Sequence, residues 1–212
     1  MHPNSNIADG YNRTAGNYAD KFLDELSHKP FDRMLIKAFA SENCHKGRLI
    51  DLGCGPGQVT KFVYECGLKE ITGIDISSAM ISIAKEINPL MQFEVANILQ
   101  LPFPDRTFGS AIAFYSLIHF DYNELKQALK EIKRVLVQDG ELLMSFHIGN
   151  NNIHLENFLD HQVSMDFHFF ETEQIRGLLT GEGFNIIDTI ERYPYKEIEY
   201  QGKRAYIWAN LF

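Results

Sequence analysis

The chain has 212 residues, a length typical of one globular domain, with 45% hydrophobic and 23% charged residues. The formal net charge of −8 argues against a nucleic-acid or anionic-membrane surface, because such a surface needs clustered lysine and arginine. The sequence has no run of roughly 18 apolar residues, and its first residues lack the basic and apolar regions of a signal peptide. The 3 cysteines and 8 histidines show neither disulfide-framework nor metal-ligand spacing. We therefore expect a cytoplasmic protein without a bound metal, a nucleic-acid partner or a membrane partner.

Two helical segments are predicted before the first strand. Between residues 11 and 28, Tyr11, Tyr18 and further apolar residues recur at helical spacing. Pro30 suits the first turn of a second helix, whose apolar residues recur at the same spacing.

Strands alternate with helices through the middle of the chain. Ser77 is a favourable N-cap for one of these helices, and Asp121 with Glu124 predicts a capping box at another. The alternation predicts a largely parallel sheet. The expected strands are residues 48–52, 71–76, 91–96, 110–115 and 141–147, the last one following a turn at residues 139–140.

The C-terminal part has a different pattern. Residues 149–170 are rich in Asn, His and Phe and are predicted to form an irregular excursion. A helix over residues 172–180 ends near Gly181 or Gly183, which suit a left-handed cap. Two strands, 184–191 and 204–209, follow with no helix between them, which predicts an antiparallel hairpin at the sheet edge.

The segment Leu49–Gly57 joins a buried strand to a glycine-rich turn. Asp51 ends the apolar run, and three evenly spaced glycines follow within residues 53–57. Glycine lets the backbone turn tightly and lets a ligand approach it closely. Pro56 suits the start of a helix, so the order strand, glycine loop, helix predicts the ligand-binding unit of a doubly wound α/β sheet. The Asp51 carboxylate repels a pyrophosphate and favours a cationic ligand.

The run from Asp51 to Gly57 resembles the first motif of the class I S-adenosylmethionine-dependent methyltransferases. Nearly the whole chain is similar to a group of small bacterial type-11-like methyltransferases in that class. In that family the loop cradles the amino-acid end of the cofactor, which carries an ammonium and a sulfonium group. The resemblance implies S-adenosylmethionine as the cofactor and S-adenosylhomocysteine as its product.

The same resemblance implies the fold. We expect a Rossmann-like, doubly wound α/β sheet of seven strands in the order 3-2-1-4-5-7-6, with the last strand antiparallel. Residues 1–212 then form one methyltransferase domain. Residues 1–45 provide an N-terminal helical lid, residues 46–148 the cofactor-binding core, and residues 149–212 the excursion, a helix and the closing edge strands.

Cofactor contacts are expected at the strand ends. Asp75 follows Gly57 by 18 positions and matches the acid that accepts both ribose hydroxyls. Asn97 stands where the family often has Asp, and its side-chain oxygen can accept from the adenine amino group as Asp does. The cofactor-binding set implied by the resemblance is Tyr18, Asp51, Gly53, Cys54, Gly55, Asp75, Ile76, Met80, Asn97, Ile98, Tyr115 and Ser116.

A second matching segment departs from the family at one position. Residues 101–108 resemble the family signature LPFPDxSFD, but Gly109 stands where the last Asp is usual. That Asp generally begins the fourth strand, so we expect a local structural change and not a loss of function.

Several residues are candidates for the acceptor side. His119, in the loop after the fourth strand, is the candidate catalytic residue, and a general base is needed only if the acceptor arrives protonated. His147 ends the fifth strand at the ligand-facing edge. Tyr11 and Tyr18 resemble lid aromatics of small-molecule methyltransferases, although their stripe also serves to pack the helix. A purely structural role is the alternative for both histidines.

Two arginines near the C-terminus complete the candidate acceptor pocket. Arg192 and Arg204 can bind a carboxylate or a phosphate of the acceptor as bidentate donors. An ordinary ion pair with Glu191, Glu197 or Glu199 is the favoured alternative for these arginines.

These observations indicate a methyltransferase that acts on a small-molecule acceptor, because only the N-terminal helices and residues 149–170 are available to build a lid. The sequence does not separate O-, N- and C-methylation, although it has no Asn/Asp-Pro-Pro-Tyr segment of the kind associated with base amino groups. One alternative is an NAD-dependent oxidoreductase, whose GxGxxG fingerprint differs from the even glycine spacing here. The other is a non-catalytic module that binds S-adenosylmethionine or S-adenosylhomocysteine.

Overall fold

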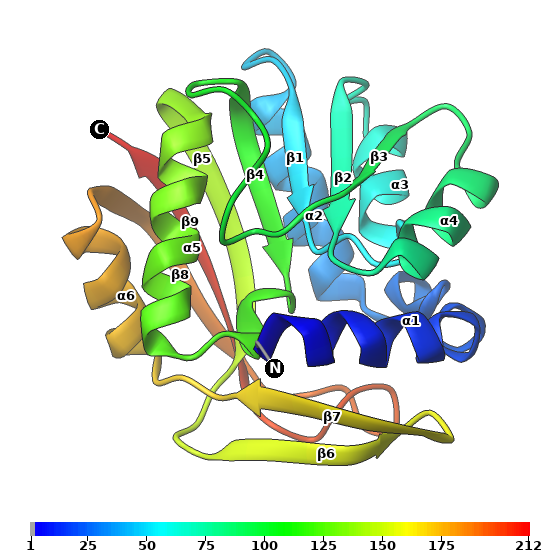
Figure 1. The fold of residues 1–212 in the computed structure, drawn as a ribbon. Coiled ribbons are helices and arrows are strands. Elements are labelled where there is room, and N and C mark those ends of the chain that lie inside the picture. Colours follow the sequence, from blue (N-terminus) through cyan, green and yellow to red (C-terminus); the bar gives the residue numbers. More distant parts are fainter. Residues whose placement is uncertain (1–2) are drawn as a thin grey trace.

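The computed structural model describes residues 3–212, and its side chains are described from residue 6 onward. Met1 and His2, which belong to the N-terminal segment expected to lack signal-peptide features, lie outside the described part. Helices lie on either side of a central sheet, and a separate hairpin crosses one end of this sheet (Figure 1). The helices are α1 (Pro3–Phe22), η1 (Glu25–His28), α2 (Pro30–Asn43), α3 (Gln58–Glu65), α4 (Ser78–Ile87), η2 (Leu117–His119), α5 (Tyr122–Val135) and α6 (Thr172–Gly181). The strands are β1 (Leu49–Leu52), β2 (Ile71–Asp75), β3 (Gln92–Val95), β4 (Phe108–Phe114), β5 (Leu136–His147), β6 (Asn152–Phe158), β7 (His161–His168), β8 (Phe184–Arg192) and β9 (Arg204–Leu211).

The central sheet confirms the predicted topology. Its seven strands lie in the order β3-β2-β1-β4-β5-β9-β8. The strands from β3 to β5 are parallel, and β9 pairs antiparallel with both β5 and β8. The strands β8 and β9 are thus the sixth and seventh strands of the expected order, and they form the expected antiparallel edge.

Alternating side chains of β5 bury both faces of the sheet. Leu142 and Met144 pack in the cluster that contains the apolar stripes of α5 and α6. Leu143 packs on the opposite face, in a cluster with residues of α2 and α3. Strands buried on both faces read as continuous apolar runs, which is why the sequence places them reliably.

The expected N-caps are confirmed. The Ser77 side chain accepts from the Met80 N–H at 3.1 Å, and Asp121 and Glu124 form a reciprocal capping box at α5. Both helices therefore begin where local sequence places them, directly after the strand or loop that carries site residues.

Gly109 has a steric reason for replacing the usual acid. A Cβ built on Gly109 would lie 1.9 Å from the Lys46 carbonyl oxygen. The backbone of Lys46 approaches β4 so closely at this point that no side chain fits. The local change expected at Gly109 is therefore this tight contact with Lys46. It lies at the amino ends of β1 and β4, away from the carboxyl ends of these strands.

Three expectations about secondary structure are wrong. Residues 149–170 form the antiparallel hairpin β6–β7 instead of an irregular excursion. The strand expected to begin at residue 141 begins at Leu136, and the expected turn lies within it, where residues 137–140 have no partner on β4 and Asp139 has a positive φ of 61°. The first helix ends at Phe22, and residues 25–28 form the separate turn η1.

The N-terminal helices divide between two roles. Helix α2 packs on the sheet, since Ile36, Phe39 and Ala40 are buried in the same cluster as Leu49 of β1. It therefore belongs to the layer that covers the sheet and not to the expected lid. Helix α1 runs across the carboxyl ends of the parallel strands, and the hairpin β6–β7 lies alongside it (Figure 1).

The contact between α1 and the hairpin is close. The Asn17 amide donates to the Leu159 carbonyl at 3.0 Å, and a Cβ on Gly10 would lie 2.6 Å from the Met165 sulfur. Together α1 and the hairpin roof the sheet end that carries the glycine loop. No helix within residues 3–212 is long and apolar enough to cross a membrane.

Candidate cofactor and acceptor site

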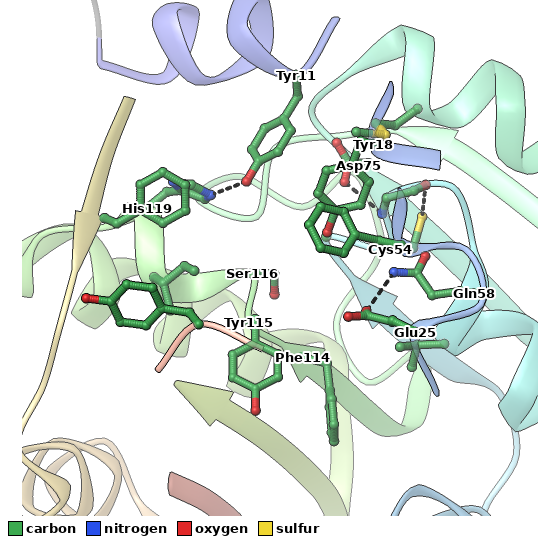
Figure 2. Close-up of a pocket in the computed structure, with 18 of the residues that line it drawn as sticks. Tyr11, Tyr18, Glu25, Cys54, Gln58, Asp75, Phe114, Tyr115, Ser116 and His119 are labelled. Atoms are coloured by element: carbon green, nitrogen blue, oxygen red, sulfur yellow. Dashed lines mark hydrogen bonds between the residues drawn. The ribbon is translucent and has the colours of Figure 1, made fainter. Parts of the chain in front are cut away.

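A cavity of about 750 Å³ lies between the carboxyl ends of the central strands and the roof made by α1 and the hairpin (Figure 2). Cavities of a few hundred to about 1,000 Å³ hold most small-molecule ligands. All twelve residues expected to bind the cofactor line this cavity, as do His119, Tyr11, His147 and Arg204. Arg192 is the one candidate site residue from the sequence that is not among its lining residues.

The glycine loop is shaped by contacts that leave no room for side chains. Gly53 has a φ of +73°, and a Cβ there would lie 2.3 Å from the Ser116 Cβ. The Gly53 and Cys54 N–H groups both donate to the Ile74 carbonyl at 2.8 Å, which ties the loop to β2. The loop is therefore pressed between β2 and the start of the segment after β4, with bare peptide facing the cavity.

Asp51 is buried beneath this loop. Its Oδ2 accepts from the Thr60 hydroxyl at 2.6 Å, and its side chain is 1% exposed. Burial raises the pKa of Asp51 to about 7, although the Thr60 hydrogen bond opposes this shift. A cation near this carboxylate would lower the cost of its buried charge.

Asp75 holds the loop and points into the cavity. Its Oδ2 accepts from the Gly55 N–H at 3.0 Å and its Oδ1 from the Ser77 N–H at 2.8 Å (Figure 2). Each carboxylate oxygen keeps a further lone pair, so the pair can also accept from two hydroxyl groups of a ligand. Burial raises the pKa of Asp75, while these N–H donors lower it.

The adenine side of the expected site is apolar with one polar group. Ile76, Met80 and Ile98 line the cavity. The Asn97 side-chain oxygen accepts from the Leu99 N–H at 2.9 Å. This turn fixes the Asn97 side chain and leaves its amide nitrogen and one oxygen lone pair for a ligand.

The segment after β4 carries strain and an unpaired polar group. Tyr115 has a positive φ of 52°, which is rare for a bulky residue and is frequent at functional sites. The Ser116 hydroxyl oxygen is buried and has no hydrogen-bond partner among the described residues. Because it lies against Gly53, a polar group of a ligand at the loop is well placed to satisfy it.

These features fit S-adenosylmethionine. The acid and the glycine loop suit its cationic amino-acid end, Asp75 suits a ribose diol, and Ile76 and Met80 suit an adenine ring. The buried Ser116 hydroxyl provides a further polar partner at the loop.

Aromatic side chains of the roof meet above the cavity. The rings of Tyr11 and Tyr18 lie edge to face with centroids 6.0 Å apart, and Phe158 of the hairpin is 6.4 Å from each. Edge-to-face packing of this kind stabilises the contact between α1 and the hairpin. The lid predicted from Tyr11 and Tyr18 thus has a second half in β6–β7.

His119 joins the two halves of the roof to the segment after β4. Its Nδ1 donates to the Asp166 carbonyl of β7 at 2.9 Å, so its Nε2 accepts from the Tyr11 hydroxyl at 2.7 Å (Figure 2). Burial lowers the pKa of His119 to about 4. The ring is therefore neutral near pH 7, and its basic nitrogen is occupied by Tyr11.

His147 lies beside Tyr115 at the end of β5. The two rings stack with centroids 5.1 Å apart and an interplanar angle of 27°. Its Nδ1 is buried without a hydrogen-bond partner in the part of the chain that the structure describes. Burial first, and then the charges of Arg204 and Lys29, lower the pKa of His147 to about 4.

The two arginines pair with one acid, which confirms the ion-pair alternative. Arg192 donates through both terminal nitrogens to Glu199 at 2.9 and 2.8 Å and through one of them to Asp32 at 2.9 Å. Arg204 pairs with the same Glu199, and its Nε has no partner within the described residues. Arg192 itself does not line the cavity, and its donors are directed to Glu199 and Asp32, two acids that do line it. Its expected contact with an acceptor therefore finds no support in this structure.

Several lining residues were not expected from the sequence. Lys29, Asp32 and Glu25 follow α1 in the chain, and no motif distinguishes them from surface charges. Phe158 and Phe167 come from the hairpin. The signal for the hairpin was present, since apolar residues alternate at positions 163, 165 and 167, which is the spacing of a strand.

The fold, the sheet order and the acid-flanked glycine loop together define a class I S-adenosylmethionine-dependent methyltransferase. Residues 50–144 match the family model described as "Methyltransferase domain". This match, together with the order of the strands, supports a class I S-adenosylmethionine-dependent methyltransferase.

The chain is similar in sequence or fold to several known proteins. The uncharacterized methyltransferase YcgJ of Bacillus subtilis is 29% identical over 148 residues, which cover 68% of this chain and 57% of YcgJ. The protein MJ1252 of Methanocaldococcus jannaschii is 27% identical over 212 aligned positions, covering 86% of this chain and 78% of MJ1252. The magnesium protoporphyrin IX methyltransferase of Synechocystis, solved with bound S-adenosylmethionine, has a TM-score of 0.76 at 16% identity and covers 100% of this chain and 98% of its own.

Proposed function

We propose that this protein transfers a methyl group from S-adenosylmethionine to a small-molecule acceptor by in-line displacement. A lone pair of the acceptor forms a bond to the methyl carbon, and the electrons of the broken carbon–sulfur bond stay on sulfur, which leaves a neutral thioether. The leaving group needs no acid, so the protein contributes mainly by aligning the two molecules and excluding water.

The observation that carries this proposal is the roofed cavity. It extends from Asp75 at the glycine loop to His147 and Tyr200 at the opposite end of the cavity, under α1 and the hairpin. A folded protein or a nucleic-acid duplex does not fit beneath such a roof, whereas a small molecule does. One relative, from Mus musculus, is an eEF1A lysine and N-terminal methyltransferase, so a protein acceptor is the alternative that the experiment has to exclude.

The proposed cofactor site is the set expected from the sequence. Asp51 and the loop face the amino-acid end of the cofactor, Asp75 the ribose, and Asn97 the adenine amino group. Tyr18, Tyr115 and the Ser116 hydroxyl line the cavity at the cofactor's methionine end, which supports their proposed contact.

His119 stays the proposed catalytic residue, in a restricted form. Its Nε2 lone pair is held by the Tyr11 hydroxyl, so a proton of the acceptor reaches it only if Tyr11 moves aside or relays the proton. With its pKa lowered to about 4, His119 is a weak base. An acceptor that arrives already ionised removes the need for this step.

The direct test is the release of S-adenosylhomocysteine from S-adenosylmethionine in the presence of a cell extract split by size. We expect turnover with the fraction of small molecules and none with the dialysed macromolecules. Turnover with the macromolecules alone would transfer the proposal to a protein or nucleic-acid acceptor. Binding of S-adenosylhomocysteine without turnover on either fraction would favour the non-catalytic module.

A further inference from the structure

Cationic side chains gather on the side of the cavity opposite the cofactor acids. Asp51 and Asp75 end β1 and β2, whereas Tyr115, His147 and Arg204 lie at β4, β5 and β9. The sheet order β2-β1-β4-β5-β9 places these two groups on different sides of the cavity, and the register pairs His147 directly with Arg204.

The basic side has two buried cations around one aromatic ring. Lys29 Nζ lies 5.6 Å from the centroid of the Tyr115 ring, and Arg204 Cζ lies 5.7 Å from it. Both side chains are nearly inaccessible, with 8% and 1% of their surface exposed. Burying a cation is costly unless an anion or a strong acceptor lies nearby.

Glu199, which lies near both cations, is already in use, whereas Asp32 keeps one buried oxygen, Oδ2, without a partner among the described residues. Glu199 accepts from Arg192 through both oxygens and from the Tyr195 N–H, in addition to its pairing with Arg204. Lys29 lies 3.8 Å from Glu199 and pairs closely only with Glu25, at 2.5 Å. Arg204 Nε and His147 Nδ1 are buried with no partner within residues 3–212. This side of the cavity therefore has donor capacity that the protein itself leaves unused.

The response of His147 shows the sign of the local potential. The charges of Arg204 and Lys29 lower its pKa more than Glu199 raises it. At the cofactor side the sign is opposite, because Asp75 raises the pKa of Tyr11 and also that of Asp51. Acidic charges thus dominate where the cationic cofactor is expected, and cationic charges dominate at His147. At the neighbouring Tyr115 the charge of Asp32 raises the pKa more than the charge of Arg204 lowers it.

The walls of the basic side are flat and aromatic. His147 stacks on Tyr115, and the Tyr200 ring approaches the His147 ring edge to face at 5.4 Å. Such walls suit a planar conjugated ring, which stacks at low entropic cost.

We infer that the methyl acceptor is a small planar aromatic molecule with a negatively charged group, which binds at Lys29, Arg204 and His147. This inference names the acceptor class and rests on the proposed function. The cofactor's positive charge and the acceptor's negative charge then occupy opposite sides of one cavity, and their attraction helps to bring the reacting atoms together. The alternative is that both cations serve only as internal ion pairs.

The test is calorimetry on the full chain saturated with S-adenosylhomocysteine, with three probes that differ in charge. Salicylate carries a carboxylate, salicylamide is its neutral amide, and benzylamine is a cation. We expect salicylate to bind at least tenfold more tightly than salicylamide and benzylamine to bind most weakly. In Lys29→Gln the preference for salicylate should fall below about threefold, while the affinity for S-adenosylhomocysteine stays within threefold of the wild type.

The matched control is Lys37→Gln, which removes the same charge from an exposed position of α2 and should keep the full preference. Equal affinity for the acid and the amide, a preference for the cation, or no binding of salicylate at millimolar concentration would overturn the inference. The wild-type comparison decides this even if the Lys29 variant is unstable. Failure to bind S-adenosylhomocysteine at all would instead overturn the proposed function.

Discussion

At the scale of single residues, the two carboxylates of the cofactor side differ in the hydrogen-bond donors around them. Asp75 accepts two backbone N–H groups, which favour its ionised form. Asp51 accepts one hydroxyl in an otherwise apolar setting, so its pKa is raised to about 7. Asp75 is thus suited to accept hydrogen bonds from a ligand, whereas Asp51 responds to the charge of the ligand.

The ribose role of Asp75 predicts a loss of cofactor affinity in Asp75→Ala. Because two hydroxyl contacts and the anchor of the Gly55 N–H disappear together, we expect S-adenosylhomocysteine to bind at least tenfold more weakly, a change of about 1.4 kcal/mol. Calorimetry measures this directly. Asp75→Asn keeps an acceptor for the loop and serves as the control for loop collapse, and unchanged affinity in both variants would refute the ribose role.

The raised pKa of Asp51 predicts that cofactor affinity depends on pH. A cationic ligand prefers the ionised carboxylate, so affinity for S-adenosylmethionine should rise with pH up to about 7, by up to about tenfold per unit. The apo protein should show the opposite trend in stability. Its folded state holds a proton on Asp51 that the unfolded state loses at lower pH, so this contribution is present in acid and is lost as pH rises through about 7.

Asp51→Asn separates this effect from the titration of Asp75, whose pKa is also raised by burial. The variant keeps an oxygen that can accept from the Thr60 hydroxyl, and its affinity should be lower and less dependent on pH. A pH profile in Asp51→Asn that matches the wild type would show that Asp51 does not sense the ligand's charge.

The close approach at Gly53 predicts that a single methyl group closes the loop. In Gly53→Ala the new Cβ would lie 2.3 Å from the Ser116 Cβ, so the loop has to shift and cofactor binding should fall at least tenfold. Gly67→Ala is the matched control, since it has a positive φ of 112° but no atom within 4 Å of the new Cβ. Both variants share the backbone strain, and only Gly53→Ala should lose affinity for S-adenosylhomocysteine in calorimetry.

At the scale of elements, the roof is joined to the rest of the molecule by polar links that can be removed one at a time. Its polar links include the Tyr11–His119 and His119–Asp166 hydrogen bonds and the contact between Asn17 and Leu159. Opening of such a roof gives a ligand a route into the cavity, and the cost of opening falls as these links are removed.

Removal of one of these links should make the roof open more often. Tyr11→Phe keeps the ring but deletes the hydroxyl that donates to His119, a loss of about 0.5–1.5 kcal/mol. We expect amide hydrogen exchange in α1 and β7 to become about two- to tenfold faster, with no change in β1 or β4. Tyr64→Phe on α3, whose hydroxyl lies outside the roof, is the control. Equal exchange in Tyr11→Phe and the wild type would mean that the hydrogen bond does not hold the roof.

The elements show which parts of the fold were accessible from the sequence. The central strands were placed within one or two residues, because strands buried on both faces are continuous apolar runs. The hairpin β6–β7 was missed. Its turn residues Leu159 and Asp160 both have positive φ, yet Leu-Asp is not the Asn-Gly or Asp-Gly pair that marks such a turn. The alternation of apolar residues in β7 was thus the one local signal of the hairpin.

The candidate site also has a part that the sequence predicts and a part that it does not. The residues expected to line the cofactor side are local to strand ends, so a motif of a few residues places them in the cavity. Lys29 and Glu199 meet only because α2 and the loop between β8 and β9 converge on Tyr115. Contacts between segments so far apart in the chain leave no local pattern. From the sequence, Glu199 was expected only as a possible ion-pair partner of an arginine.

At the scale of the whole molecule, the order of the strands places the cofactor acids and the buried cations at different ends of one cavity, although Asp32 and Glu199 also line the cationic end. The net charge of the chain is −8, but this total conceals the cations that line the β4–β5–β9 side. The acids at β1 and β2 face a site suited to a cation, and the roof of α1 and β6–β7 encloses both sides. Exclusion of water beneath the roof strengthens each of these electrostatic contacts.

The most direct test of this account is calorimetric titration of the wild-type protein with S-adenosylmethionine and, in parallel, with NADH. We predict saturable binding of S-adenosylmethionine at one site per chain and no measurable heat from NADH, because the buried Asp51 disfavours a diphosphate at the loop. Binding of NADH, or the absence of binding by S-adenosylmethionine, would contradict the assignment of the cavity.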